Sequence, residues 1–315
     1  MNRIVFMGTP DFAVPSLEAL ITAGYEVAAV FTNPDRPKGR SGKPAFSPVK
    51  ECALAHGIPV HQPQKLREPA NIELLGDLKP DAIVVCAYGQ IVPKQVLELP
   101  PYGCINVHGS LLPKYRGAAP IQWAVIDGEK ESGVTIMQMA EGLDTGDMLA
   151  KCVRVLEPDE TGGSLFDKLK EDGAALLVQT LQALERGEIT PVKQPEESPT
   201  PYAKMLTKEM GRIDWSQSAV CLERLVRGMD PWPGTYTQLS GKQVKLWKTR
   251  VAESEALRGG AKPGTVVHVG KASFLVQTGD GLLEILELQL EGKKRMDTQA
   301  FLRGCHLEEG FVLGA

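Results

Sequence analysis

The segment INVHGSLLPKYRG, residues 105–117, carries side chains that could promote acyl transfer. Alternate side chains share one face of a strand, so Asn106 and His108 point the same way with Cβ atoms about 7 Å apart. An Asn amide can donate to a developing oxyanion, and an imidazole can take up a proton near neutral pH. A lone His is more often a hydrogen-bonded core residue, but the paired Asn and the irregular loop that follows favour a functional site.

An acidic candidate lies downstream in the Gly-rich turn EGLDTGDML. Either Asp144 or Asp147 could orient a histidine or receive its proton. An Asp in such a turn more often serves the turn itself through local hydrogen bonds. Spacing alone does not choose between the two acids.

A basic segment follows the second expected strand. Residues 33–48, NPDRPKGRSGKPAFSP, are too long for an ordinary βα connection of about 2 to 6 residues, and long loops are usually functional or disordered. Between residues 36 and 50 there is no acid, and the cations are Arg36, Lys38, Arg40, Lys43 and Lys50. A flexible, solvated loop is the alternative to a binding loop.

Buried-type strands must position these residues. The apolar runs at 2–7, 26–32, 58–62, 81–88 and 103–110 alternate with helical spacing at 11–23, 49–57 and 71–78. This alternation is typical of a doubly wound, mostly parallel α/β sheet that is covered on both faces. Ligands of such sheets bind at the carboxyl ends of the strands, where His108 is expected to lie.

The length of 315 residues exceeds what one core of about 250 to 300 residues usually holds. After a long helix expected over 164–187, the Pro-rich sequence ITPVKQPEESPTPYAKM is typical of a semi-extended linker. Five short β-type runs beyond residue 234 then predict a small OB-like barrel. We therefore expect a catalytic α/β domain over 1–188, a linker over 189–206 and a C-terminal OB-like domain over 207–315.

Composition excludes several classes of protein. Hydrophobic residues at 43%, charged residues at 23% and a net charge of −4 are those of a folded globular chain. No run approaches the roughly 18 apolar residues of a membrane span, and the start does not resemble a signal peptide. The six cysteines form no CxxC and no Cys/His cluster at ligand spacing, so we expect a reduced, cytoplasmic protein without structural zinc. We also expect a monomer, although no feature of the sequence reveals the oligomeric state. The first turn, GTPDFA, is neither GxGxxG nor a P-loop, which disfavours a dinucleotide or ATP site.

INVHGSLLPKYRGAAP with LDTGD downstream resembles the 10-formyltetrahydrofolate-dependent formyltransferase family, and the resemblance extends through the linker and the PWPG turn. It implies that Asn106, His108 and Asp144 are catalytic, which selects Asp144 over Asp147, and that no metal is needed. It also implies that 10-formyltetrahydrofolate is the formyl donor. The residues implied for the folate site are Ser110, Leu111, Leu112 and Pro113.

FMGTPDFA and NPDRPKGRSGK are similar to the members of that family that formylate initiator methionyl-tRNA. The resemblance implies that the basic loop meets the acceptor end of the tRNA through Arg36, Lys38, Arg40 and Lys43. Two C-terminal clusters, Lys293–Arg295 and the cations of GKQVKLWKTR, fit the same phosphate-binding role, although either cluster alone is more often a solvated face. Strict alternation along the latter would place Lys242, Lys248 and Arg250 on one face and Lys245 on the other.

Two alternatives stay open. The same three residues could formylate a small amine, such as a nucleotide sugar, although such a substrate needs neither the basic loop nor the C-terminal domain. The chain could also be an RNA-binding protein without enzymatic activity, which the presence of all three catalytic candidates disfavours.

Overall fold

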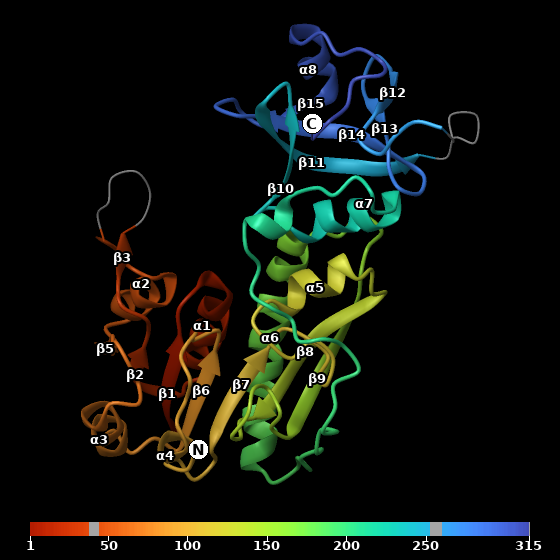
Figure 1. Cartoon of the computed structure of the whole chain (residues 1–315). Helices are drawn as coiled ribbons and strands as arrows, with labels where there is room; N and C mark the ends of the chain where they lie inside the picture. The colour runs from red at the N-terminus through yellow and green to blue at the C-terminus, as the bar shows by residue number, and fades with distance from the viewer. Residues whose placement is uncertain (38–43, 253–259, 315) are drawn as a thin grey trace. The chain divides into compact units, whose positions relative to one another are not determined.

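The computed structural model describes residues 1–37, 44–252 and 260–314 and divides the chain into two compact units (Figure 1). Unit 1 comprises residues 1–120, 131–155 and 166–203, and unit 2 comprises residues 121–130, 156–165 and 204–315. Each unit therefore contains more than one stretch of the chain. The finer division into 1–188, 189–206 and 207–315 stays a prediction. No helix among the described residues is long and apolar enough to cross a membrane.

Unit 1 is built on a seven-stranded sheet in the order β5-β2-β1-β6-β7-β8-β9. The first five strands of that order are parallel, β8 is antiparallel to β7, and β9 is antiparallel to β8. The strands are β1 Arg3–Gly8, β2 Glu26–Phe31, β5 Val60–His61, β6 Ala82–Cys86, β7 Cys104–His108, β8 Glu131–Gln138 and β9 Met148–Val155. The mostly parallel α/β class is confirmed.

Helices lie between these strands in the chain, and α6 follows the last of them. Every residue of β6 and β7 is buried, as expected for parallel strands that are covered on both faces. The helices are α1 Val14–Thr22, α2 Pro48–Ala55, α3 Pro69–Asp77, α4 Lys94–Leu97, α5 Pro120–Ile126 and α6 Gly162–Glu185, and a 3-10 turn spans Asp11–Ala13. Leu169, Leu177 and Leu181 of α6 are fully buried, which agrees with the helical spacing of the sequence.

The basic segment begins and ends in a short antiparallel pair, β3 Arg36–Pro37 and β4 Pro44–Ala45, in which Arg36 is opposite Ala45. Arg36 is exposed. Lys38, Arg40 and Lys43 lie outside the described residues.

Unit 2 contains an antiparallel sheet in the order β10-β11-β14-β13-β12, and β15 pairs with β14. Its elements are α7 Ala219–Gly228, β10 Thr235–Leu239, β11 Lys242–Ala252, β12 Val266–Val269, β13 Phe274–Gln277, β14 Leu282–Leu290, β15 Met296–Asp297 and α8 Thr298–Gly304. Its core includes Trp215, Leu222, Leu246, Phe274 and Ile285. All five β-type runs of the sequence are strands.

The expected alternation along β11 is wrong. The register of β11 against β14 shifts on both sides of Lys248. Before this bulge the buried positions are Val244 and Leu246, and after it the buried position is Thr249. Because an extra residue in one strand reverses the facing of all later side chains, Lys242 does not share a face with Arg250.

Candidate active site

Asn106 and His108 belong to the C-terminal half of β7, and His108 is its last residue. The strand lies between β6 and β8 (Figure 1). Asn106 is opposite Val85 and Met137, and His108 is opposite Thr135. The two residues are only 8% and 6% exposed. Among the described residues no hydrogen-bond partner is present for the Asn106 side chain. Its amide is therefore free to bind a ligand at the carboxyl end of the strand.

The imidazole of His108 is fixed by the loop that follows it. Its Nε2 lies 3.1 Å from the carbonyl oxygen of Tyr115, and a carbonyl can only accept, so Nε2 carries a proton. The other nitrogen, Nδ1, lies 3.8 Å from Oδ2 of Asp144. This distance is longer than a hydrogen bond, and the contact is an ion pair only when the ring is protonated. Nδ1 is therefore the ring nitrogen that faces the acid.

Asp144 is placed by its own backbone and by the loop after β7. Its φ of 52° lies in the left-handed region, which Asp tolerates better than most residues. Its Oδ2 accepts a hydrogen bond of 2.9 Å from the amide of Gly117. The neighbouring acid Asp147 is exposed instead. Of the two acids that spacing left open, the structure brings Asp144 next to His108.

The SLLP loop, residues 110–113, has one polar side chain, Ser110, and it is buried away from any ligand. Ser110 and Leu112 are fully buried, and the Ser110 hydroxyl donates to the carbonyl of Lys114 at 2.7 Å. Thr135 on β8 donates to the Ser110 carbonyl at 2.7 Å and accepts from the Leu112 amide at 3.1 Å. Leu111 and Pro113 are partly exposed. A ligand at this loop would therefore meet these two apolar side chains and a rigid backbone.

Residues 192–203, within the predicted linker, form a strap that is hydrogen-bonded to the site loop. Val192 and Met148 exchange two backbone hydrogen bonds of 2.9 Å. The Ser198 hydroxyl donates to the Pro113 carbonyl at 2.8 Å, and the Thr200 hydroxyl accepts from the Tyr115 amide at 2.7 Å. The strap ends with Ala203, whose amide donates to the Arg116 carbonyl at 2.8 Å. Its prolines suggest a linker, but this part of the chain belongs to unit 1.

Gln194 connects the strap to the turn of Asp144. The Gln194 side chain is 5% exposed, and its Nε2 donates to the carbonyls of Asp144 at 2.9 Å and Gly146 at 2.7 Å. Its Oε1 accepts from Nε and Nη2 of Arg116 at 3.1 and 3.0 Å. Arg116 is itself 8% exposed and also donates to the carbonyls of Pro195 and Glu196. Neither residue was predicted from the sequence: Arg116 lies within the INVHGSLLPKYRG segment but gives no sign there of its partner, and Gln194 stands in no recognisable motif.

The base of the basic segment is held by polar contacts. Lys50 Nζ donates to Oδ2 of Asp35 at 2.6 Å and to Oε1 of Gln62 at 2.7 Å. These hydrogen bonds from Lys50 and Gln62 lower the pKa of Asp35. Lys50 is therefore neutralised by an acid immediately before the acid-free run, whereas Arg36 is exposed. Among the cations of the run that the structure describes, Arg36 is the one available to an anionic partner.

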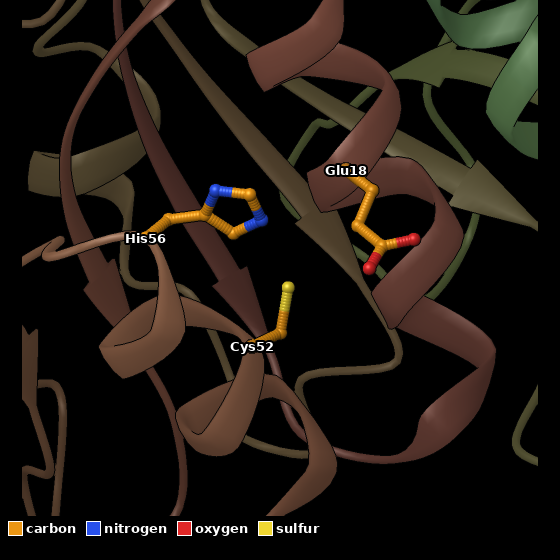
Figure 2. Close-up of side chains that lie close together, drawn as sticks. All are labelled: Glu18, Cys52 and His56. Carbon is orange, nitrogen blue, oxygen red and sulfur yellow. The ribbon is translucent and has the colours of Figure 1, made fainter.

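A second cluster corrects an expectation from the sequence. Cys52 and His56 lie one helical turn apart, on α2 and at its C-terminal end, and Glu18 on α1 faces them (Figure 2). One ligand atom of each side chain lies within 4.8 Å of the others. Burial, and to a smaller extent the Glu18 carboxylate, raises the pKa of the Cys52 thiol. The expectation of no Cys/His cluster was wrong because an i, i+4 pair becomes a cluster only once a helix forms.

Comparisons with known proteins agree over both units. Residues 1–181 match the model for the formyl transferase family, and residues 205–306 match that for the formyl transferase C-terminal domain. The methionyl-tRNA formyltransferase of Agathobacter rectalis is 56% identical over 308 residues, covering 98% of each chain. The enzyme of the same name from Lachnospira eligens is 56% identical over 314 residues, covering 99% of each.

Two solved structures show the same fold at low identity. WlaRD, described as a sugar 3N-formyl transferase, is 19% identical with a TM-score of 0.67, covering 93% of this chain and 99% of its own. HypX from Aquifex aeolicus, solved with tetrahydrofolic acid, is 22% identical with a TM-score of 0.60. The match covers 96% of this chain but only 47% of HypX. With both family models matched and full-length relatives at 56% identity, this chain belongs to the formyltransferase family.

Proposed function

We propose that this protein transfers a formyl group from 10-formyltetrahydrofolate to the amino group of initiator methionyl-tRNA, giving N-formylmethionyl-tRNA for translation initiation. The observation that carries this proposal is the 56% identity, over nearly the whole of both chains, to enzymes named methionyl-tRNA formyltransferase. The site supports it by placing an amide donor, an imidazole and a carboxylate at one sheet edge.

The reaction is an acyl transfer. The amine nitrogen of the acceptor bonds to the formyl carbon, the bond from that carbon to the folate nitrogen breaks, and a proton passes from the amine to the leaving nitrogen. Negative charge develops on the formyl oxygen on the way. The unpartnered amide of Asn106 can donate to that oxygen, and one such donor is typically worth about 2.7–4 kcal/mol of transition-state stabilisation.

The proton is handled by His108 and Asp144. With Nε2 donating to Tyr115, Nδ1 of His108 is the nitrogen that gains and loses a proton. Asp144 at 3.8 Å stabilises the ring when it is protonated. The hydrogen bond from Gly117 keeps the carboxylate aimed at the ring during that cycle. The pair thus acts as an acid–base unit beside the acceptor amine.

The folate supplies the formyl group. The residues that would hold it are those of the SLLP loop, Ser110 to Pro113. The loop fits an apolar part of the folate, because Leu111 and Pro113 are partly exposed, whereas Ser110 and Leu112 are buried and hydrogen-bonded within the protein. We therefore assign Leu111 and Pro113 to apolar contact with the folate, and Ser110 and Leu112 to fixing the shape of the loop.

The tRNA is assigned to the exposed cations. Arg36 in β3 would bind phosphate, and Lys38, Arg40 and Lys43 are proposed from the sequence alone. One argument from the sequence against a small acceptor no longer holds. WlaRD, described as a sugar formyltransferase, matches 93% of this chain, so a C-terminal domain is not peculiar to enzymes with a tRNA acceptor. The choice of tRNA rests on the identity of 56% to the tRNA enzymes against 19% to WlaRD.

A cytoplasmic location is proposed with this substrate, and the monomeric state stays a prediction. The test is to incubate the protein with 10-formyltetrahydrofolate and, in parallel, initiator methionyl-tRNA, an amino sugar nucleotide and glycinamide ribonucleotide, and to follow the folate released. Release with the tRNA alone is the expected result. Release with a small amine and not with tRNA would overturn the assignment of the acceptor, and no release with any of them would overturn the enzyme.

A further inference from the structure

Figure 2 shows Glu18, Cys52 and His56 directed toward one another from two helices of unit 1. Cys52 is partly buried and the other two are exposed. Within the described part of the chain none of the three side chains has a hydrogen-bond or ion-pair partner. Three different metal-ligating groups therefore meet at one place with nothing else to bind.

We propose that Glu18, Cys52 and His56 form a site for a divalent cation of the zinc class. Thiolate, imidazole and carboxylate together are ligands that zinc accepts at about 2.0–2.3 Å, and a soft thiolate disfavours magnesium or calcium. Tetrahedral ligation at these lengths places ligand atoms about 3.3–3.6 Å apart. The observed separations of up to 4.8 Å need a small rotation of exposed side chains. A fourth position remains for water.

Such an ion would join α1 to α2. The N-cap of α2 is Ser47, two residues after the end of β4, so the ion would also anchor the end of the basic segment. No step of formyl transfer uses it. Its expected effect is on stability, because a ligand that binds only the folded state raises the unfolding temperature.

The test uses the full chain after chelation, titrated with Co²⁺ and then with Zn²⁺ in competition. We expect one equivalent of cobalt with a thiolate-to-cobalt charge-transfer band, displacement by zinc and a raised unfolding temperature. Cys52→Ser should abolish the band, and Glu18→Gln and His56→Ala should each weaken binding by about tenfold or more. Cys221→Ser, which removes an exposed cysteine elsewhere, is the control. Affinity unchanged in all three variants, or a band that survives Cys52→Ser, would overturn the site.

A second inference concerns Gln194 and rests on the proposed function. Asp144 touches two partners that lead to the same strap: its carboxylate binds the Gly117 amide, and its carbonyl binds Gln194. Arg116, next to Gly117, donates to the other end of the Gln194 amide. Hydrogen bonds and the peptide bond between Arg116 and Gly117 therefore form a closed circuit through Asp144, Gly117, Arg116 and Gln194.

We infer that Gln194 is a positioning residue for Asp144. Its amide is the member of the circuit that accepts from a buried cation with one atom and donates to two carbonyls with the other. Glutamate at this position would still pair with Arg116 but would turn an oxygen toward the carbonyls of Asp144 and Gly146. Glutamine is therefore the side chain of this length that satisfies both ends.

The test compares Gln194→Ala and Gln194→Glu with Gln182→Ala, an exposed glutamine on α6. Because displacing a catalytic group by about 1 Å can cost about 100-fold, kcat should fall about 10- to 100-fold in both Gln194 variants with little change in KM. The pH dependence of kcat should change shape, since the acid beside His108 has moved. A merely structural loss would scale kcat without altering that profile and would overturn the inference. An inactive parent protein would instead refute the proposed function.

Discussion

Oδ2 of Asp144 lies 3.8 Å from Nδ1 of His108, and the same oxygen is hydrogen-bonded to the backbone of Gly117. The carboxylate is therefore held at a fixed distance by the loop after β7 rather than by the imidazole. The carboxylate attracts the imidazole electrostatically only when the ring carries a positive charge. In the proposed function Asp144 and His108 take part in the proton transfer, whereas Gly117 only holds Asp144 in place. The following variants test the proposed roles.

Asn106→Ala and His108→Ala should each abolish most formyl transfer. Loss of one oxyanion donor typically lowers kcat by about 10²–10³, and loss of the proton acceptor should be comparably severe. Binding of tRNA, assigned to other surfaces, should survive in both. Single-turnover kinetics and a filter-binding assay measure the two properties. Near-normal turnover of either variant at saturating substrate would refute its catalytic assignment.

Asp144→Asn should lower the rate strongly while the fold is retained. The Asn oxygen can still accept from Gly117, so the loop keeps its hydrogen bond and only the charge is lost. Asp147→Asn, at the exposed acid of the same turn, is the matched control and should leave kcat within about twofold. Circular dichroism checks folding. Equal damage in the two variants would remove the reason for singling out Asp144.

Arg36→Ala should weaken tRNA binding and make it less sensitive to salt. Each phosphate contact that is lost should flatten the log–log dependence of affinity on salt by about 0.7–0.9. Arg186→Ala is the control, since Arg186 is an exposed arginine paired with Glu188. Unchanged slope with lost discrimination between initiator and elongator tRNA would indicate base reading instead. No change in affinity, slope or discrimination would leave Arg36 as a solvated residue.

Acid should destabilise unit 1 through Asp81, which joins the beginnings of the central strands β1 and β6. Hydrogen bonds from the backbone amides of Arg3 and Asn2 lower the pKa of Asp81. Near these pKa values Asp81 therefore binds fewer protons in the folded protein than in the unfolded chain. The carboxylate stabilises the folded protein above the unfolded pKa of about 3.9, and this stabilisation is lost as the pH falls through the lower pKa of the folded state. The free energy of unfolding from urea titrations should depend less steeply on pH below about 4 in Asp81→Asn than in the parent.

Asp77→Asn, which removes an exposed acid on α3, is the reference for this measurement. A pH dependence that is the same in Asp81→Asn and in the parent protein would show that the carboxylate contributes nothing to acid stability.

The sequence predicted the elements whose signal is local and strong. The apolar run of β7 places Asn106 and His108 on one face, and that placement needs no information from elsewhere in the chain. The contacts of the strap could not be predicted because its hydrogen bonds join residues far apart in sequence, and Pro-rich composition describes only its stiffness. The bulge at Lys248 was missed for a similar reason, since register depends on the partner strand β14.

The strap also sets an order of events during synthesis. Asn106, His108 and Asp144 all precede residue 192, yet the loop that aligns two of them is bonded to Gln194, Ser198 and Thr200. A nascent chain that ends at residue 188 would contain every proposed catalytic side chain and the contacts of His108 with Tyr115 and of Asp144 with Gly117, but it would lack the hydrogen bonds from the strap. The hydrogen bonds between the strap and the site would therefore form only after residue 203 has left the ribosome, when most of unit 1 is already available to fold.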